Sequence, residues 1–197
     1  MQSLYELKPD LKGRGKLLDV GCGSGQEIDR LRLENIDIHG IDIDDIALEI
    51  ARQKNPKAIF QNATSTNIPY KDKTFDAVIS SVALPYVNIQ NSLQEIARVL
   101  EKDGYLWLSM HSVNMTFGYF LFYIRKLRPK PTLFTFYALI NGVWFHLTGR
   151  TFCFPFFRHK YESFQTKRGM RLALKRAGFT KVRILCNGKL YVECVKK

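Results

Sequence analysis

Three glycines at alternate positions directly follow a short apolar run in the segment LLDVGCGSG, from Leu17 to Gly25. Glycine loses more conformational freedom on folding than any other residue, so this spacing indicates a turn that other residues do not readily adopt. The apolar run predicts a buried strand, and the residues from Gln26 onward predict a helix. A strand, a glycine turn and a helix bring backbone N–H groups to one point, which suits an anionic or strongly polar ligand.

Five strands are predicted in the first 110 residues. Hydrophobic runs place them at Lys16–Val20, Ile36–Ile41, Ala58–Phe60, Phe75–Ser80 and Tyr105–Met110. Helical patterns lie between these runs. Such an alternation of strand and helix is typical of a parallel sheet that is covered on both faces.

The helices are expected over Gln26–Leu33, from Asp44 or Asp45 onward, and across SLQEIARVL. In the second of them, Ile46, Ile50 and Ala51 are expected to point inward, and the aspartate at its start caps the helix. In the third, Ser92 and Glu95 have the spacing of a capping box.

A last helix and a hairpin are predicted after residue 161. Thr166 can cap the helix, whose apolar side carries Met170, Ala173, Leu174 and Ala177. Two strands, Lys181–Cys186 and Lys189–Val195, are separated only by Asn-Gly, which is a strong hairpin signal. The prediction is therefore an α/β fold with a seven-stranded, mostly parallel sheet that ends in an antiparallel hairpin strand.

Charge divides the chain unevenly. Residues 1–103 carry 13 Lys/Arg and 16 Asp/Glu, whereas residues 104–161 carry 7 Lys/Arg and no acidic residue. We therefore expect a single domain, 1–197, with a core at 16–111, an aromatic and basic cap insertion at 112–161, and a C-terminal part at 162–197 that completes the sheet. The basic part is suited to an anionic partner.

Two classes of ligand compete for the glycine turn. A dinucleotide fingerprint, GxGxxG, would require glycine at position 26, where this chain has Gln26. Asp42 follows the second predicted strand, in IHGIDID, and an acidic residue there can accept both hydroxyls of a ribose. One ribose and a polar tail favour a mononucleoside ligand over a dinucleotide.

The chain resembles the class I S-adenosylmethionine-dependent methyltransferases, and most closely their quinone-biosynthesis (methyltransferase type 11) branch. Five segments carry the resemblance in the order of the family: LLDVGCGSG, GIDID, NATSTNIPYKDKTFDAVISS, SLQEIARVLEKDG and RAGFTKV. The resemblance implies a Rossmann-like fold and S-adenosylmethionine as the cofactor. The four cysteines lack the spacing of metal ligands, so no metal is expected.

The resemblance also implies roles for particular residues. Gly21, Cys22, Gly23 and Gly25 form the loop that approaches the methionine part of the cofactor, and Asp19 supports this loop. Asp42 holds the ribose hydroxyls. The remaining expected cofactor contacts are Ile43, Asn62, Ala63 and Ser80. The family often has aspartate where this chain has Asn62, whose amide offers both a donor and an acceptor.

His111 and Tyr86 are the candidate catalytic residues. The methyl group of a sulfonium is already activated, so a base is needed only where the acceptor must lose a proton. His111 follows the fifth predicted strand, at the carboxyl end of the sheet where ligands bind. Tyr86 follows the fourth, whereas His146 and His159 lie in the cap and are expected to be structural.

The function expected is methyl transfer to a small, lipophilic acceptor. Two alternatives remain open, an RNA (tRNA or rRNA) methyltransferase and a non-catalytic S-adenosylmethionine-binding protein. The cap is expected to form amphipathic helices that close the acceptor site, with aromatic faces that line it or rest on an anionic membrane surface. Packing of these aromatic residues against the sheet is the open alternative to membrane contact. The first dozen residues lack the apolar segment of a secretory signal, so a cytoplasmic protein, peripheral at a membrane, is expected.

Overall fold

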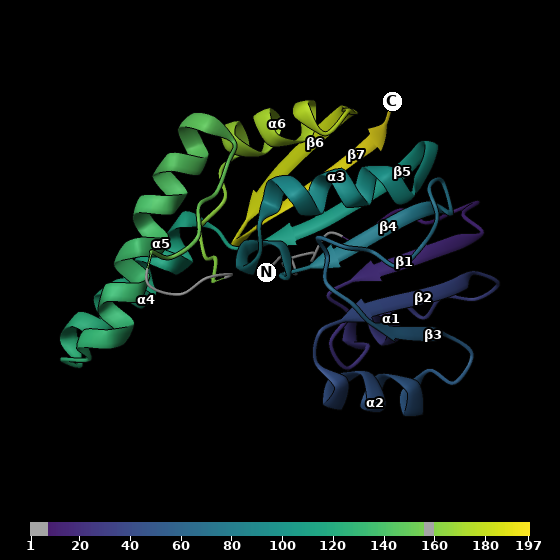
Figure 1. Cartoon of the computed structure of the whole chain (residues 1–197), viewed down its shortest axis with the longest axis horizontal. Helices are drawn as coiled ribbons and strands as arrows, with labels where there is room; N and C mark the ends of the chain where they lie inside the picture. Colours follow the sequence, from purple (N-terminus) through teal and green to yellow (C-terminus); the bar gives the residue numbers. More distant parts are fainter. Residues whose placement is uncertain (1–7, 156–159) are drawn as a thin grey trace, which may run out of the picture.

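The computed structural model of the 197-residue chain describes residues 8–155 and 160–197. Its centre is a seven-stranded sheet with the strand order β3-β2-β1-β4-β5-β7-β6 (Figure 1). The strands are β1 (Lys16–Val20), β2 (Asp37–Asp42), β3 (Ile59–Asn62), β4 (Phe75–Ser81), β5 (Leu100–Met110), β6 (Phe179–Asn187) and β7 (Lys189–Lys196). All seven predicted strands are thus present, with ends displaced by a few residues.

The sheet is parallel except at β7. Strand β1 pairs in parallel with β2 and β4, and the parallel pairing continues to β3 and β5. Strand β7 lies between β5 and β6 and is antiparallel to both. Gly188, with φ of +70°, makes the turn between β6 and β7. The predicted Rossmann-like sheet with an antiparallel C-terminal hairpin strand is confirmed.

The helices are α1 (Gln26–Leu31), α2 (Asp45–Lys54), α3 (Ile89–Val99), α4 (Val113–Arg125), α5 (Pro129–Thr148) and α6 (Lys167–Arg176), with a short 3-10 helix at Leu84–Tyr86. Successive side chains of the central strands enter different cores. Leu18, Val78 and Leu106 pack with α3 and α6, whereas Leu17 and Ala77 lie in a second core on the opposite face. The buried strands therefore read as continuous apolar runs, as the sequence indicated.

Two local predictions are wrong. Ala51 is buried as predicted, but Ile46 is 77% exposed and Ile50 is also exposed, because α2 buries Leu48 in their place. Ser92 and Glu95 do not form a capping box. Helix α3 begins earlier, where the side chain of Asn88 accepts a hydrogen bond from the N–H of Asn91. By contrast, Thr166 caps α6 as predicted and accepts from the N–H of Gly169.

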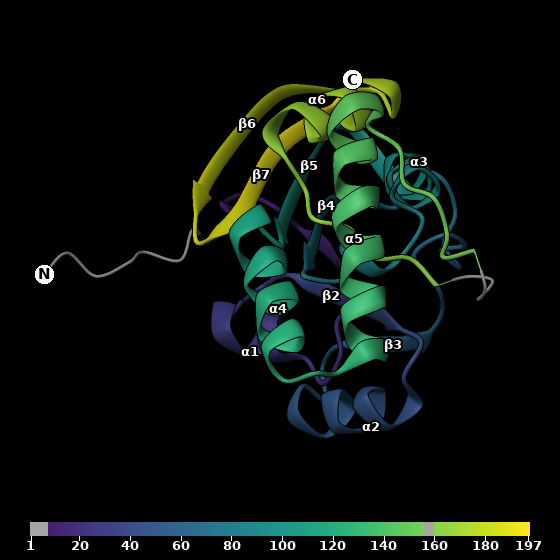
Figure 2. The same ribbon diagram turned by 90° about the vertical axis from the view of Figure 1, so that its left-hand side faces the viewer.

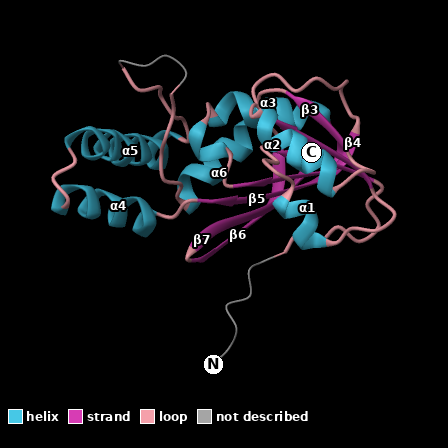
Figure 3. Ribbon diagram, turned by 90° about the horizontal axis from the view of Figure 1, so that it is seen from below, coloured by secondary structure: helices cyan, strands magenta, loops and turns pink. Residues whose placement is uncertain are grey.

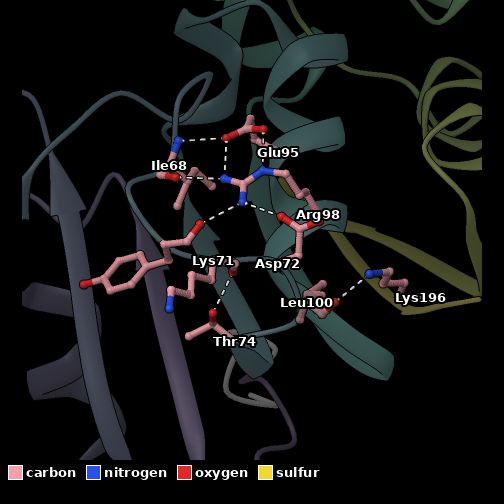
Figure 4. A network of polar contacts seen from close by, with 9 residues as sticks. Ile68, Lys71, Asp72, Thr74, Glu95, Arg98, Leu100 and Lys196 are labelled. Atoms are coloured by element: carbon pink, nitrogen blue, oxygen red, sulfur yellow. Dashed lines mark hydrogen bonds and ion pairs between the residues drawn. The ribbon is translucent and has the colours of Figure 1, made fainter.

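Glu95 and Arg98 of α3 instead hold the loop between β3 and β4 (Figure 4). The Arg98 guanidinium donates to both oxygens of Glu95, each at 2.8 Å, and to the carbonyls of Ile68 and Tyr70 at 2.8 and 2.7 Å. Glu95 accepts the N–H of Ile68, and these bonds lower the pKa of its carboxyl. Buried Ser65 shares a 2.8 Å hydrogen bond with Ser92, so this loop is fixed to α3 at several points.

Helices α4 and α5 form a pair at the carboxyl edge of the parallel strands. Figure 2 shows them in front of the strand ends, and Figure 3 shows the pair extending away from the sheet. The segment that follows α5 returns to the core, where Thr151 donates its N–H to Gln90 of α3. None of the helices formed by residues 8–155 and 160–197 combines the length and apolarity that crossing a membrane requires.

The Arg98 network predicts an unequal response to two arginine substitutions. Arg98→Ala removes charge-assisted hydrogen bonds to two backbone carbonyls and to Glu95, so it should lower the free energy of unfolding by about 2 kcal/mol. Arg52, whose side chain is 44% exposed, provides the control, and Arg52→Ala should cost less than about 1 kcal/mol. Urea titration measures both. Equal urea midpoints for the two variants would contradict the structural role of Arg98.

Candidate functional site

The glycine turn has the backbone conformation that its sequence predicts. Gly21, Gly23 and Gly25 all have positive φ, at +73°, +51° and +79°. The N–H groups of Gly21 and Cys22 donate to the carbonyl of Ile41, at 2.8 and 3.0 Å, which ties the turn to the neighbouring strand β2. Residues with a side chain rarely adopt these values of φ, so the three glycines are needed to form this turn.

The turn passes very close to the loop after β4. A Cβ atom at Gly21 would lie 2.2 Å from the Cβ of Ala83, which is well inside contact distance. Val82, next to Ala83, has φ of +60°, a conformation that β-branched residues seldom adopt. The ends of β1 and β4 therefore approach so closely that residue 21 must be glycine on steric as well as conformational grounds.

Asp42 lies at the end of β2 and faces this turn. Its Oδ2 accepts the N–H of Gly23 at 2.8 Å, and its Oδ1 accepts the N–H of Asp44 at 3.0 Å. A carboxylate oxygen can accept more than one hydrogen bond, so both oxygens keep capacity for a ligand. The partly buried Asp42 is thus held in position and can still accept two hydroxyl groups.

A cleft of about 550 Å³ opens beside Asp42 at the carboxyl edge of the sheet. Among the expected cofactor residues, Gly21, Asp42, Ile43 and Ala63 line it. The described lining does not include Asn62, whose amide nitrogen donates to the carbonyl of Ile43 and to the side chain of Asp45. A ligand contact by Asn62 would have to use its amide oxygen or replace one of these bonds.

Further lining residues were not singled out from the sequence. They are Thr64, Ser65, Thr66, Ala83, Val87, Asn88, Asn91 and Tyr161. Thr64–Thr66 belong to the loop that Arg98 and Ser92 hold, and they lie within NATSTN, one of the segments that suggested the family. Tyr161 is the last residue of the cap, and nothing in its local sequence signals a place in the cleft.

Asp19 is buried beneath the turn with an unusual environment. Both of its carboxylate oxygens lack a hydrogen-bond partner among the described residues, so any support that Asp19 gives the loop does not come from hydrogen bonds to them. Burial, Glu27 and Asp42 raise the pKa of this carboxyl well above its usual range. A positive charge in the adjacent cleft would offset the negative charge of Asp19 and favour its ionised form.

Ser80 and Cys22 are directed into the protein. The Ser80 hydroxyl donates to the carbonyl of Val20 at 2.7 Å and joins β4 to β1. Cys22 packs in the core between α1, α2 and β3, and burial raises the pKa of its thiol. These side chains position the turn, and the described lining of the cleft does not include them.

The structure brings together the two candidate catalytic residues. The Tyr86 hydroxyl lies 2.6 Å from Nε2 of His111, and Tyr86 also lines the cleft. Burial, with a smaller effect from Lys189, lowers the pKa of His111, whereas burial raises the pKa of Tyr86. Near neutral pH both side chains are therefore uncharged, and His111 can receive a proton.

Two other residues clarify the surroundings of this pair. Glu162, half-buried just after the cap, has a carboxyl pKa that burial raises, and its negative charge contributes to the high pKa of Tyr86. His146 shares a 3.1 Å hydrogen bond with Thr166, the residue that caps α6, so its contact is structural. His159 lies outside the described residues.

Comparison with known proteins agrees with this geometry. The family model of the methyltransferase domain matches residues 18–108. The ubiquinone/menaquinone biosynthesis C-methyltransferase of Campylobacter jejuni is 29% identical over 191 residues, which cover 91% of this chain and 74% of that protein. The demethylmenaquinone methyltransferase of Tropheryma whipplei is 33% identical over 122 residues, 58% of this chain and 50% of that protein.

A solved structure from Thermotoga maritima has the same fold. Described as a SAM-dependent methyltransferase, possible histamine N-methyltransferase, it aligns with a TM-score of 0.64 at 20% identity over all of this chain and 86% of its own. The sheet order, the glycine turn and the domain match define the class. This chain belongs to the class I S-adenosylmethionine-dependent methyltransferases, whose methyl donor is S-adenosylmethionine.

The position of Asp42 predicts its effect on cofactor affinity. Asp42→Ala removes a charged acceptor for two ribose hydroxyls and should weaken S-adenosylmethionine binding by roughly 1–3 kcal/mol. Asp37, at the other end of β2, supplies the control, because Asp37→Ala leaves the cleft unchanged. Calorimetry measures both affinities. Binding by Asp42→Ala with the affinity of the wild type would remove Asp42 from the cofactor site.

Asp19 predicts a pH-dependent stability. Its pKa in the folded protein exceeds the unfolded value of about 3.9. At pH values between these two pKa values, the folded state binds more protons than the unfolded state, so the free energy of unfolding falls as pH rises. Asp19→Asn removes this loss and should raise the thermal midpoint of the cofactor-free protein at pH 8 more than at pH 5.

The same substitution should oppose cofactor binding. An uncharged amide cannot offset the positive charges of S-adenosylmethionine, so its affinity should fall by about tenfold or more in Asp19→Asn. Thermal unfolding with and without the cofactor measures both effects. A variant that is less stable than the wild type at pH 8 would contradict the assignment of Asp19 as an unpaired buried carboxyl.

Proposed function

We propose that this methyltransferase transfers the methyl group of S-adenosylmethionine to a small, lipophilic acceptor. The observation that carries the proposal is one continuous cleft that joins Asp42 and the glycine turn to Tyr86. One end has the acceptors that a ribose requires, and the other has a tyrosine paired with a histidine. Cofactor and acceptor would therefore meet at the carboxyl edge of the sheet.

The cofactor residues would act by position and charge. Asp42 would accept the ribose hydroxyls, Ile43 and Ala63 would contact the adenine, and the negative charges of Asp19 and Asp42 would favour the positive end of the cofactor. When bound, the cofactor supplies an activated methyl group on a sulfonium sulfur. The close approach of Gly21 to Ala83 would then hold the backbone against the cofactor.

Tyr86 and His111 would act on the acceptor. An acceptor that carries an acidic hydroxyl becomes a better nucleophile when the proton leaves, whether the methyl group adds to the oxygen or to a ring carbon made electron-rich by it. The proton would pass through the Tyr86 hydroxyl to Nε2 of His111. The low pKa of His111 keeps this nitrogen free to accept a proton at neutral pH.

Two relatives support the lipophilic class of acceptor. The Campylobacter jejuni protein is named for ubiquinone/menaquinone biosynthesis and the Tropheryma whipplei protein for demethylmenaquinone. Reduced quinone precursors are therefore the first compounds to test. They are aromatic, carry ring hydroxyls and partition into membranes, so an enzyme that methylates them gains from proximity to a membrane surface.

A transfer assay tests the proposal directly. The protein is incubated with labelled S-adenosylmethionine and either reduced quinone precursors or unmodified tRNA, and mass spectrometry identifies the methylated product. Methylation of a lipophilic hydroxyl compound is expected. Methylation of tRNA alone would favour the RNA methyltransferase, and cofactor binding without transfer to any acceptor would favour a non-catalytic binding protein.

The Tyr86–His111 pair predicts a specific kinetic change. His111→Ala should lower kcat by about 100-fold or more while cofactor affinity stays within about twofold, because the base is lost and the cofactor contacts remain. The acid limb of the wild-type profile should lie below the usual range of histidine, because burial lowers the pKa of His111. His146→Ala is the control. Unchanged turnover in His111→Ala would exclude His111 as the base.

A further inference from the structure

The cap presents an apolar face to solvent. On α5, the large apolar side chains that are exposed recur every three or four residues, so they form one stripe: Leu133, Phe136, Ile140, Val143, Trp144 and Leu147. The opposite side of α5 is buried. There the Asn141 amide donates to the carbonyls of Phe152 and Glu162 and packs beside Phe145. Helix α5 is therefore held by its inner face, and the side chains of the outer stripe remain about half exposed.

Helix α4 adds a second exposed stripe. Val113, Phe117, Leu121 and Ile124 are exposed at helical spacing. Thr116 is the one residue of this helix that is buried. Ile124 of α4 lines an open apolar groove together with Leu133 and Phe136 of α5, so the two stripes meet on one face of the pair. This groove, of about 720 Å³, lies where the turn joins α4 to α5.

This arrangement differs from the expected lid. Among the described residues of the cap, Tyr161 alone lines the cofactor cleft. Tyr137 and Phe145 of α5 are buried, but other aromatic side chains of the pair remain exposed or contact each other, as Phe120 and Phe136 do at 6.1 Å. Packing of the cap against the sheet would have buried the two stripes, so it does not explain them.

The turn between α4 and α5 is basic. Arg125, Lys126, Arg128 and Lys130 are all exposed there, and residues 104–161 contain no acidic side chain that could neutralise them. Leu127, in the middle of these cations, is 88% exposed. An apolar face bordered by cations at one end matches the interface of an anionic bilayer, where apolar side chains enter the acyl boundary and cations contact headgroups.

We propose that the α4–α5 pair docks this enzyme on anionic lipid bilayers, with the two stripes and Leu127 in the interface and the four cations on the headgroups. The charge pattern selects this occupant over a second copy of the chain, because residues 104–161 contain no acidic side chain with which a second copy of this face could pair the cations. Docking would place the carboxyl edge of the sheet near the source of a lipophilic acceptor. The proposal does not depend on the identity of that acceptor.

Vesicle binding by the full chain, without acceptor, tests the proposal. Phosphatidylglycerol vesicles should bind the protein at low salt and phosphatidylcholine vesicles should not, and added salt should weaken binding. The chain has two tryptophans, of which Trp107 is buried and Trp144 is 49% exposed. A blue shift of fluorescence on binding therefore reports that Trp144 enters the interface.

Three variants locate the contact. Neutralising Arg125, Lys126, Arg128 and Lys130 to Gln should lower affinity for anionic vesicles by at least about tenfold. Leu133→Gln, Ile140→Gln and Leu147→Gln, combined, should abolish the blue shift. Changing Lys167, Arg168, Arg171 and Lys175 of α6 to Gln removes as many exposed charges and should have little effect. Each variant is first shown to bind S-adenosylmethionine normally, which confirms that it is folded.

Three results would overturn the proposal. Absence of binding to anionic vesicles by the wild type would do so directly. If the α6 variant and the variant without the four cations of the α4–α5 turn lost equal affinity for anionic vesicles, binding would depend on net charge and not on this face. A dimer in sedimentation analysis that protects Trp144 from quenching, and that the stripe substitutions dissociate, would assign the face to a second copy of the chain.

Discussion

The contact between two loops at the carboxyl edge of the sheet determines the rest of the site. The turn after β1 and the loop after β4 approach until a single added carbon at Gly21 would overlap Ala83. This approach needs glycines with positive φ on one side and the strained backbone of Val82 on the other. It also positions the two flanking groups, because Asp42 is bonded to the same turn and Tyr86 follows the same loop. The cleft lies between these groups.

Much of this arrangement could be predicted from the sequence. The glycines, Asp42 and the Asn-Gly turn each have local requirements for backbone geometry or charge that few residues meet. The mostly parallel sheet followed from alternating strands and helices, and its antiparallel end followed from the hairpin signal. These features are local or depend on the general rules of parallel sheets, so one sequence is sufficient to predict them.

The errors arose where two local solutions compete. Helix α2 has apolar residues on two sides, Ile46 and Ile50 on one and Leu48 and Ala51 on the other, and only tertiary packing selects the buried side. Asn88 and Ser92 are both suitable caps, and the buried Ile89 places the start of α3 at Asn88. Asp19 has no hydrogen-bond partner among the described residues, and Tyr161 lines the cleft. Both features depend on contacts between distant parts of the chain, so no local sequence pattern indicates them.

The cofactor site and the cap differ in the sign of their charge. The acidic half of the chain contributes Asp19 and Asp42, which favour a cofactor with a positive charge, and the basic cap carries exposed cations far from them in sequence. If the acidic and basic residues shared one surface, each partner would also be attracted to the site of the other. The distribution of charge in this chain is therefore consistent with two partners of opposite sign, a cationic cofactor and an anionic surface.

Amide hydrogen exchange with and without S-adenosylmethionine tests the cofactor site most directly. Protection is expected in the glycine turn at 21–25, after β2 at 42–45 and in the loop at 63–66, because a bound cofactor covers these segments and slows their opening. The pair α4–α5 and the hairpin β6–β7 should exchange as before. If the cofactor left the glycine turn unprotected, or protected only the cap, the placement of the cofactor beside the glycine turn would be wrong.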